Sequence, residues 1–156
     1  MQDARMKHLS SWTMSVLLCW VAFALRLGPL WANRFHSDEA LYATWALSIA
    51  TWHDPLLVGV APDKPPLLFY TQAVAFLVLG HVEVAARLAG LIAGVLSVAL
   101  VWRIALIIPP ARFFSQAWAK KVEATAGVAA TAMALSPFAI LFSPTAFLDP
   151  LMVMFV

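Results

Sequence analysis

Residues 36–70 read HSDEALYATWALSIATWHDPLLVGVAPDKPPLLFY, and this polar stretch lies between apolar runs of membrane-spanning character. It holds four of the eight acidic residues of the chain, together with Lys64, two histidines and a Pro-Pro pair. The four acids are Asp38, Glu39, Asp54 and Asp63. Such a stretch predicts a polar loop at a bilayer surface, where these side chains can support chemistry.

The composition is that of a membrane protein. The 156 residues are 63% hydrophobic and 12% charged, and the mean hydropathy is +0.85, whereas about half of a soluble domain is apolar. The net charge of +2 comes from clustered basic residues and not from a stripe, so we expect no nucleic-acid partner. The single cysteine, Cys19, lies in an apolar run and excludes an intramolecular disulfide.

Three apolar runs predict membrane spans. They cover about 12–31, interrupted only by Arg26, about 84–108 and about 124–142. A cleaved signal peptide is the alternative for the first run, but the run is long for one and lacks a clear small-x-small cleavage site. The final residues resemble the start of another helix, so we expect about three spans, the start of a fourth, and the N-terminal fragment of a longer protein.

Two shorter helices are predicted inside the loop of about 32–80. Ser37 is the expected N-cap of a helix from Asp38 to about Trp52, in which Tyr42 and Trp45 suit interface anchors. Pro65-Pro66 precedes a second apolar piece, 67–79, which is too short to span comfortably. We therefore expect juxtamembrane helices.

The basic residues predict the orientation. They gather at the N-terminus and around the loop of 109–123, which the positive-inside rule places in the cytoplasm. The loop of 32–80 then faces outward, and Asp149, beyond the third span, returns to the same outer side as Asp38 and Asp63. The basic residues concerned are Arg5, Lys7, Arg103, Arg112, Lys120 and Lys121.

Each polar motif has a structural and a functional interpretation. Asp38 and Glu39 suit the first turn of a helix, but either can act as a general base or metal ligand. Asp63 and Lys64 suit a solvated ion pair, worth about 0 to 1 kcal/mol. Alternatively, Lys64 can bind a phosphate and Asp63 a divalent cation.

The remaining candidates also have two interpretations. On local grounds Asp149 suits the N-cap of the next helix, with Pro150 at its first position. Arg87 can simply extend its charge from the start of the second span toward the interface. His36 and His53 fit no metal-ligand pattern.

The order and spacing of these motifs resemble the lipid-linked sugar glycosyltransferases of the GT-C class, in particular the protein mannosyltransferases and bacterial aminoarabinose transferases. The resemblance covers essentially the whole chain and rests on a basic N-terminus with one span, followed by five motifs. They are FHSDEALYA at 35–43, WHDP at 52–55, DKPPL at 63–67, AARLAG at 85–90 and FLDPL at 147–151. It implies an all-α, multi-span helical bundle with juxtamembrane helices in the first outer loop.

The resemblance also implies roles for individual residues. Asp38 matches an essential acid of the first outer loop, Glu39 is its neighbour, and Asp149 matches a second acid after the third span. Lys64 matches a lysine that contacts the donor phosphate. Asp63 stands where the aminoarabinose transferases carry a glutamate that helps to bind a metal, which leaves a divalent metal cofactor open.

We therefore expect a glycosyltransferase that moves a sugar from a polyprenyl-phosphate donor to a lipid, protein or glycan acceptor on the outer face of a bacterial inner membrane. Asp38 is the expected base, Lys64 the phosphate ligand, and Arg26 and Arg87 its possible helpers near the outer interface. The rival is a non-catalytic transporter or scaffold subunit. Transporters tend to have internal repeats and broken helices, and the sequence indicates neither.

Overall fold

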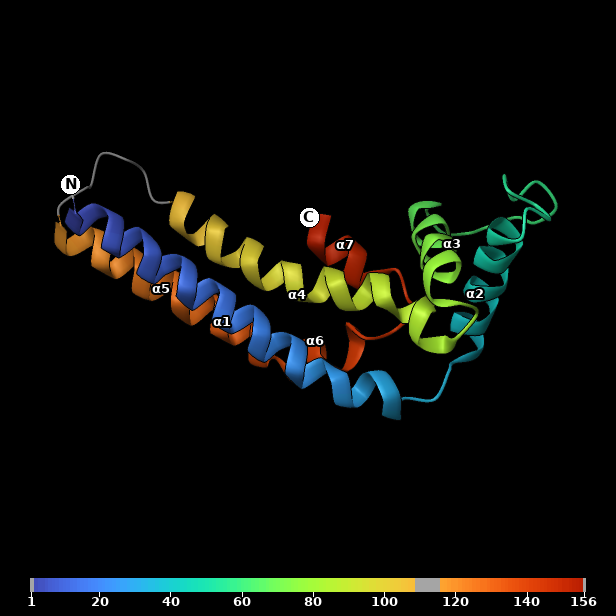
Figure 1. Cartoon of the computed structure of the whole chain (residues 1–156), viewed down its shortest axis with the longest axis horizontal. Coiled ribbons are helices and arrows are strands. Elements are labelled where there is room, and N and C mark those ends of the chain that lie inside the picture. The colour runs from blue at the N-terminus through green and yellow to red at the C-terminus, as the bar shows by residue number, and fades with distance from the viewer. Residues whose placement is uncertain (1, 109–115, 156) are drawn as a thin grey trace.

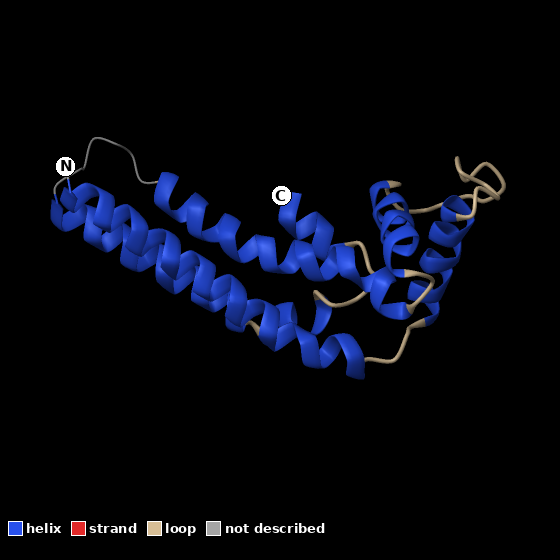
Figure 2. Cartoon of the chain, viewed as in Figure 1, coloured by secondary structure: helices blue, strands red, loops and turns tan. Residues whose placement is uncertain are grey.

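The computed structural model describes the backbone of residues 2–108 and 116–155, and side chains within 12–108 and 120–155. Every regular element in these ranges is a helix (Figures 1 and 2). The helices are α1 (Gln2–Ala32), α2 (Ser37–Ala50), α3 (Leu67–Leu79), α4 (Glu83–Ile107), α5 (Gln116–Leu135), α6 (Pro137–Phe142) and α7 (Asp149–Phe155). The predicted all-α class is confirmed for this part of the chain.

Among the residues described, two helices are long and apolar enough to cross a membrane. In α1 the segment Trp12–Ala32 has 21 residues and a mean hydropathy of 1.6, and α4 has 25 residues and a value of 2.2. The end of α1 and both ends of α4 match the predicted spans to within a residue, whereas α1 begins at Gln2, before the predicted start. At about 1.5 Å per residue the segments cover about 32 Å and about 38 Å, enough for a bilayer core of about 30 Å.

The third predicted span, 124–142, is not one helix. The helix α5 begins earlier, at Gln116, so that it includes Lys120 and Lys121, and it ends at Leu135. Ser136 then leaves the helical conformation, with φ −57° and ψ 119°, and α6 starts at Pro137. The proline is the physical reason, because its ring disfavours helical geometry in the residue before it and it has no N–H to donate. Residues 109–115 of the predicted basic loop, which include Arg112, lie outside the described residues.

Small residues let the long helices approach closely. Ala126, Ala130 and Ala134 recur every fourth residue along α5 and are buried in one cluster with Ala22 of α1 and Trp102 of α4. Small side chains at such contacts allow backbones to come together, as is usual where helices pack within a membrane. The helix α4 contacts α1, α3, α5 and α7, so it is the central element of the bundle.

The two shorter helices are present where they were predicted. Figure 1 shows α2 and α3 side by side across one end of the long helices, with the connection between them projecting to one side. His36, and not Ser37, is the N-cap of α2. Its Nδ1 accepts a hydrogen bond from the amide of Asp38 at 3.2 Å, and Glu39 Oε2 accepts one from the amide of His36 at 2.9 Å. Glu39, three residues after His36, completes this reciprocal cap, which explains why His36 and not Ser37 is the N-cap.

The segment between α6 and α7 is pressed against α4 at Gly90. A Cβ atom added there would lie 2.5 Å from the carbonyl oxygen of Thr145 and 2.6 Å from that of Ser143. Only glycine permits this approach, which carries the chain from α6 back to the end of the bundle where α2 and α3 lie. It thereby sets the position of Asp149.

Candidate functional site

Tyr42 is at the centre of the candidate site. It lies in the second turn of α2, is 6% exposed, and belongs to a buried apolar cluster with Leu57 and Phe69. Its ring centroid is 5.9 Å from that of Phe69 and 6.4 Å from that of Phe147. These contacts join α2, α3 and the segment that precedes α7.

Four of the charged residues predicted from the sequence act on the Tyr42 hydroxyl. Burial raises the pKa of the Tyr42 phenol, the charge of Lys64 opposes this, and those of Asp63, Asp38 and Asp149 raise it further. The three acids and the lysine come from α2, from the segment between α2 and α3, and from α7. Asp38, Asp63, Lys64 and Asp149 therefore lie near enough to Tyr42 for their charges to act on its hydroxyl, and we call these four residues the charged face.

Lys64 and Asp63 form an exposed ion pair. The Lys64 Nζ donates to Asp63 Oδ2 at 2.7 Å, and this hydrogen bond with the accompanying charge attraction raises the lysine pKa and lowers that of Asp63. An ammonium group has three donors. Two donors of Lys64 therefore remain for another anionic oxygen.

Glu39 is buried beneath this surface. It is 2% exposed and accepts four hydrogen bonds: from the amide of His36, from Nε and Nη2 of Arg87, and from the amide of Ala146 at 2.7 Å. Glu39 was predicted beside Asp38 in a catalytic role. The structure directs the two side chains differently, because Asp38 is exposed while the carboxylate of Glu39 is already satisfied within the protein.

Arg87 is buried with Glu39. Its Nη1 donates to the carbonyl oxygens of Leu30 at 3.2 Å and Asn33 at 3.0 Å, and its guanidinium lies 5.1 Å from the centroid of the Phe35 ring. Arg87 is 1% exposed, so its charge does not extend into the interface as the structural interpretation of the sequence suggested. The geometry favours a role in holding α1, α2 and α4 together over direct contact with a phosphate.

Arg26 is enclosed by the long helices. It is 0% exposed, and its Nη1 donates to the carbonyl oxygens of Ala22 at 2.9 Å and Ala134 at 3.4 Å. Its Nε and Nη2 have no hydrogen-bond partner among the described residues. The guanidinium is therefore enclosed by protein between α1 and α5, and its place near the outer interface stays a prediction.

Asp149 is exposed at the first turn of α7. It borders a cavity of about 200 Å³ whose wall also includes Gly94, Ser97, Ser136 and Ser143. Most of the remaining lining is apolar, and the hydroxyls of Ser97 and Ser143 donate to carbonyl oxygens in their own helices. The carboxylate of Asp149 is therefore the group at this cavity that can bind the hydroxyl of an acceptor.

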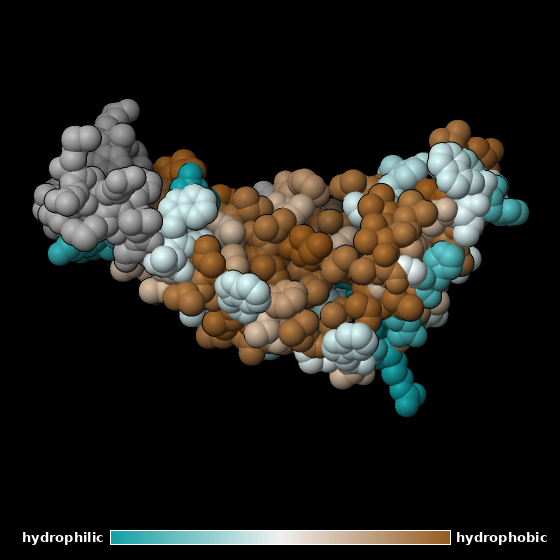
Figure 3. Space-filling view, viewed as in Figure 1, coloured by the Kyte–Doolittle hydropathy of each residue, from teal (hydrophilic) through white to brown (hydrophobic). Residues whose placement is uncertain are grey.

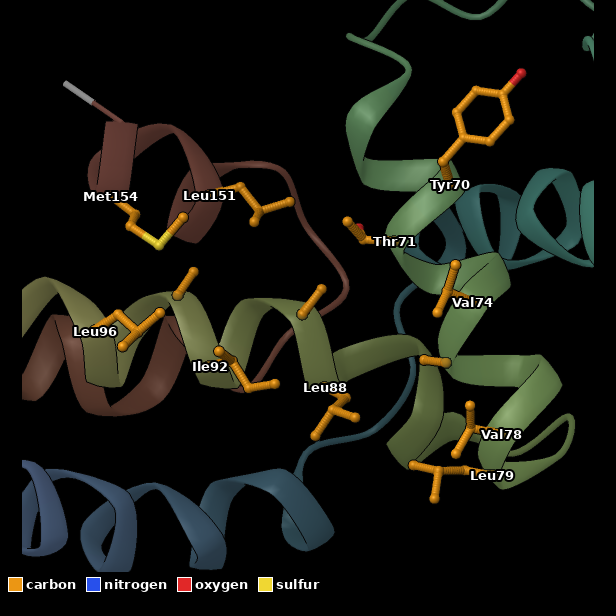
Figure 4. A pocket seen from close by; sticks show the side chains of 13 residues that line it. Tyr70, Thr71, Val74, Val78, Leu79, Leu88, Ile92, Leu96, Leu151 and Met154 are labelled. Atoms are coloured by element: carbon orange, nitrogen blue, oxygen red, sulfur yellow. The ribbon is translucent and has the colours of Figure 1, made fainter.

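An apolar groove of about 550 Å³ lies next to the Tyr42 cluster. Its thirteen lining residues come from α3, α4 and α7, and Figure 4 shows the side chains from these three helices around one space. Ala93 and Leu151 belong both to the groove lining and to the buried cluster around Tyr42. The groove therefore shares two wall residues with the buried cluster that contains Tyr42.

The described side chains do not form a site that fits a divalent metal ion. No three histidine, cysteine, aspartate or glutamate side chains in this part of the chain gather closely enough to hold one, and Asp63 is bound to Lys64. The metal remains a prediction, and no step below involves it.

Sequence reasoning missed two features of the site. Tyr42 was interpreted as an interface anchor, although its place one turn after Asp38 puts it on the same face of α2 and could have indicated a shared site. Asp54 was not assigned a role. Its carboxylate accepts hydrogen bonds from the amides of Val58 at 2.9 Å and Gly59 at 2.7 Å, and so organises the turn that precedes Lys64.

Comparison with known proteins gives no relative. No protein-family model, no curated protein and no solved structure matches the chain.

Proposed function

We propose that this protein is a membrane glycosyltransferase that moves a sugar from a polyprenyl-phosphate donor to an acceptor on the outer face of the membrane. The observation that supports this function best is that the apolar groove shares wall residues with the buried cluster of Tyr42, while charged residues act on the Tyr42 hydroxyl. A polyprenyl-phosphate sugar is apolar along its chain and anionic at its head, so it needs both surfaces side by side.

The donor lies with part of its isoprenoid chain in the groove between α3, α4 and α7. A volume of about 550 Å³ is in the range of ordinary ligand pockets, about 300–1,000 Å³. Lys64 then binds the donor phosphate with the two donors that Asp63 leaves free. Positive charge at this point stabilises the phosphate as it departs.

The reaction is a displacement at the anomeric carbon. The acceptor hydroxyl oxygen forms a bond to that carbon while the bond to the phosphate oxygen breaks, and the phosphate keeps the electron pair. Asp38, exposed and within electrostatic range of Lys64, takes the acceptor proton. Asp149 orients the acceptor, and the displacement inverts the anomeric configuration.

The roles of the buried ion pair are indirect. Glu39 and Arg87 hold the first turn of α2 against α4, which fixes the direction in which Asp38 points. They are positioning residues, and Asp38, Asp149 and Lys64 are the residues that touch substrate.

The protein lies in a bacterial inner membrane, with its N-terminus in the cytoplasm and the Tyr42 face outside. Support comes from α1 and α4, which are long and apolar enough to span, and from the basic residues near the opposite end of the bundle, such as Arg103, Lys120 and Lys121.

The test is donor binding and turnover by the purified protein in detergent. Undecaprenyl phosphate should bind more tightly than undecaprenol, and Lys64→Met should abolish this preference while Lys64→Arg keeps most of it. With a radiolabelled polyprenyl-phosphate sugar, Asp38→Asn should stop transfer without weakening binding. The proposal is wrong if the unaltered protein binds undecaprenyl phosphate and undecaprenol equally well. It is also wrong if both Asp38→Asn and Asp149→Asn transfer sugar normally.

A transporter or scaffold subunit is the second candidate, and one observation favours it. The break between α5 and α6 at Ser136 lies close to Arg26, a buried charge with two nitrogen atoms that lack partners among the described residues. Broken helices and buried charges are typical of transporters. Uptake of a small anion into vesicles, lost in Arg26→Lys and with no sugar transfer by the unaltered protein, would support this candidate instead.

A further inference from the structure

The turn between α2 and α3 exposes large apolar side chains. Within residues 51–60, Trp52 is 79% exposed, Leu56 75% and Val58 82%. They lie close together in the sequence and surround Leu57, which is 6% exposed and buried in the Tyr42 cluster. One apolar residue thus fixes the turn to the protein while its neighbours on either side point outward.

Hydrogen bonds hold this turn in place. The Asp54 carboxylate accepts from the amides of Val58 and Gly59, and the Tyr70 hydroxyl donates to the carbonyl oxygen of Pro55 at 2.9 Å. The exposed side chains are therefore presented by an ordered backbone.

The backbone of the turn is also strained. Trp52 has φ 59° and Leu57 has φ 53°, and these are the non-glycine residues with positive φ in the described chain. Bulky side chains rarely adopt this conformation, and it persists only where the surroundings enforce it. A strained backbone that holds apolar side chains outward does not stabilise a protein in water. The turn is therefore expected to face an apolar environment.

We infer that this turn inserts Trp52, Leu56 and Val58 into the interface of the same membrane that α1 and α4 cross, an inference that rests on the proposed membrane location. Figure 1 shows the turn to the side of the long helices, at the end where α2 and α3 lie across them. A segment at that position meets the lipid around the bundle and not the bundle itself. Tryptophan is enriched at this level of a bilayer.

The helix α3, which follows the turn in the sequence, also has an apolar surface. On α3, Val74, Leu77 and Val78 are 60%, 66% and 76% exposed. Figure 3 shows apolar surface over the long helices and again at the upper tip of the turn. The nearest lysine, Lys64, is paired with Asp63, so contact with lipid depends on apolar burial and not on anionic headgroups.

A fluorescence experiment tests the insertion. In a Cys19→Ala background, Leu56→Cys and Val58→Cys carry an environment-sensitive label, and the protein is placed in phosphatidylcholine vesicles that contain a nitroxide quencher at headgroup depth. The emission maximum of both labels should shift to shorter wavelength, and the quencher should remove most of their fluorescence intensity. Replacing part of the phosphatidylcholine with phosphatidylglycerol should leave the quenching unchanged.

Two matched positions make the outcome decisive. A label at Asp63→Cys should behave as in water. One at Ile104→Cys, half exposed near the cytoplasmic end of α4, should be quenched by the same headgroup-depth nitroxide in the other leaflet. If 104 is quenched but 56 and 58 behave like 63, or emit to the blue without quenching because protein covers them, the inference is overturned while the membrane location stands. If 104 is not quenched, the membrane location itself fails. The experiment does not measure sugar transfer. A failure of this inference can therefore be distinguished from a failure of the proposed glycosyltransferase activity.

Discussion

The guanidinium of Arg87 and the carboxylate of Glu39 form a buried ion pair in which two nitrogen–oxygen distances are 3.3 Å. The two residues are 48 positions apart. Through their further hydrogen bonds they connect the end of α1, the start of α2, the start of α4 and the segment before α7. The pair therefore fixes the start of α2, which carries Asp38, and the segment that leads to Asp149.

Breaking the pair from one side should be more harmful than replacing both partners. We expect Glu39→Gln or Arg87→Met alone to cost about 3–5 kcal/mol, because each leaves a buried group without its partner. The double variant Glu39→Gln with Arg87→Met should cost clearly less than the two single costs added together. Unfolding of the purified protein in detergent measures this, and strict additivity of the two costs would contradict the pairing.

Gly90 should be intolerant of any side chain. In Gly90→Ala the new methyl group meets the carbonyl oxygens of Thr145 and Ser143, so the segment before α7 must move away from α4 and carry Asp149 with it. We expect a loss of about 1–3 kcal/mol.

Gly127→Ala in α5 is the matched control for Gly90→Ala. A Cβ at Gly127 would meet only the Trp102 ring at 3.6 Å, an ordinary van der Waals distance, and alanine is favoured over glycine inside a helix by about 0.5–1 kcal/mol. Thermal unfolding should therefore separate the two variants in opposite directions. Similar behaviour of both would show that the segment is not pressed on α4.

The turn of residues 54–59 should loosen in acid. Hydrogen bonds from the amides of Gly59 and Val58 lower the pKa of Asp54, so the turn gains stability from the ionised form above the unfolded-state pKa, near about 4. This stability is lost as the pH falls through the lower folded-state pKa. The protection of the Val58 and Gly59 amides against hydrogen exchange, relative to the intrinsic rate at each pH, should fall below about pH 4, and Asp54→Ala should show low protection at every pH. If the protection of these two amides in the unaltered protein does not change with pH, Asp54 does not have this role.

Accessibility should differ between the two ends of the bundle. With Cys19→Ala as background, Asp63→Cys should react with a membrane-impermeant thiol reagent added outside intact cells. Lys120→Cys, also at an exposed position, should react only after the cells are opened. Labelling of position 120 from outside would reverse the proposed orientation.

Local sequence patterns predicted most of the elements but few of their contacts. The helices α1, α2, α3 and α4 follow from apolar runs, from the acidic first turn after His36 and from Pro65-Pro66. The third span was predicted as one helix because its apolar run continues through Ser136-Pro137. Hydropathy does not report the backbone conformation that Pro137 imposes on Ser136.

The candidate site could be predicted only in part. The sequence placed Asp38, Asp63, Lys64 and Asp149 on one side by counting crossings, although residues in the third crossing belong to two helices. It could not distinguish Asp38 from Glu39, which are adjacent but differ in burial, because a helix turns about 100° per residue and sends neighbours in different directions.

The sequence by itself determined the helical class, the two long apolar segments and the polar connection between them, since these depend on composition and on periodicity over a few residues. Tertiary structure decided which charges are buried and which remain exposed. Arg87 pairs with Glu39, and Arg26 donates to carbonyl oxygens of α1 and α5, only when helices far apart in the chain pack together. Burying a charge is tolerable only beside such partners, and no local pattern specifies where they will be.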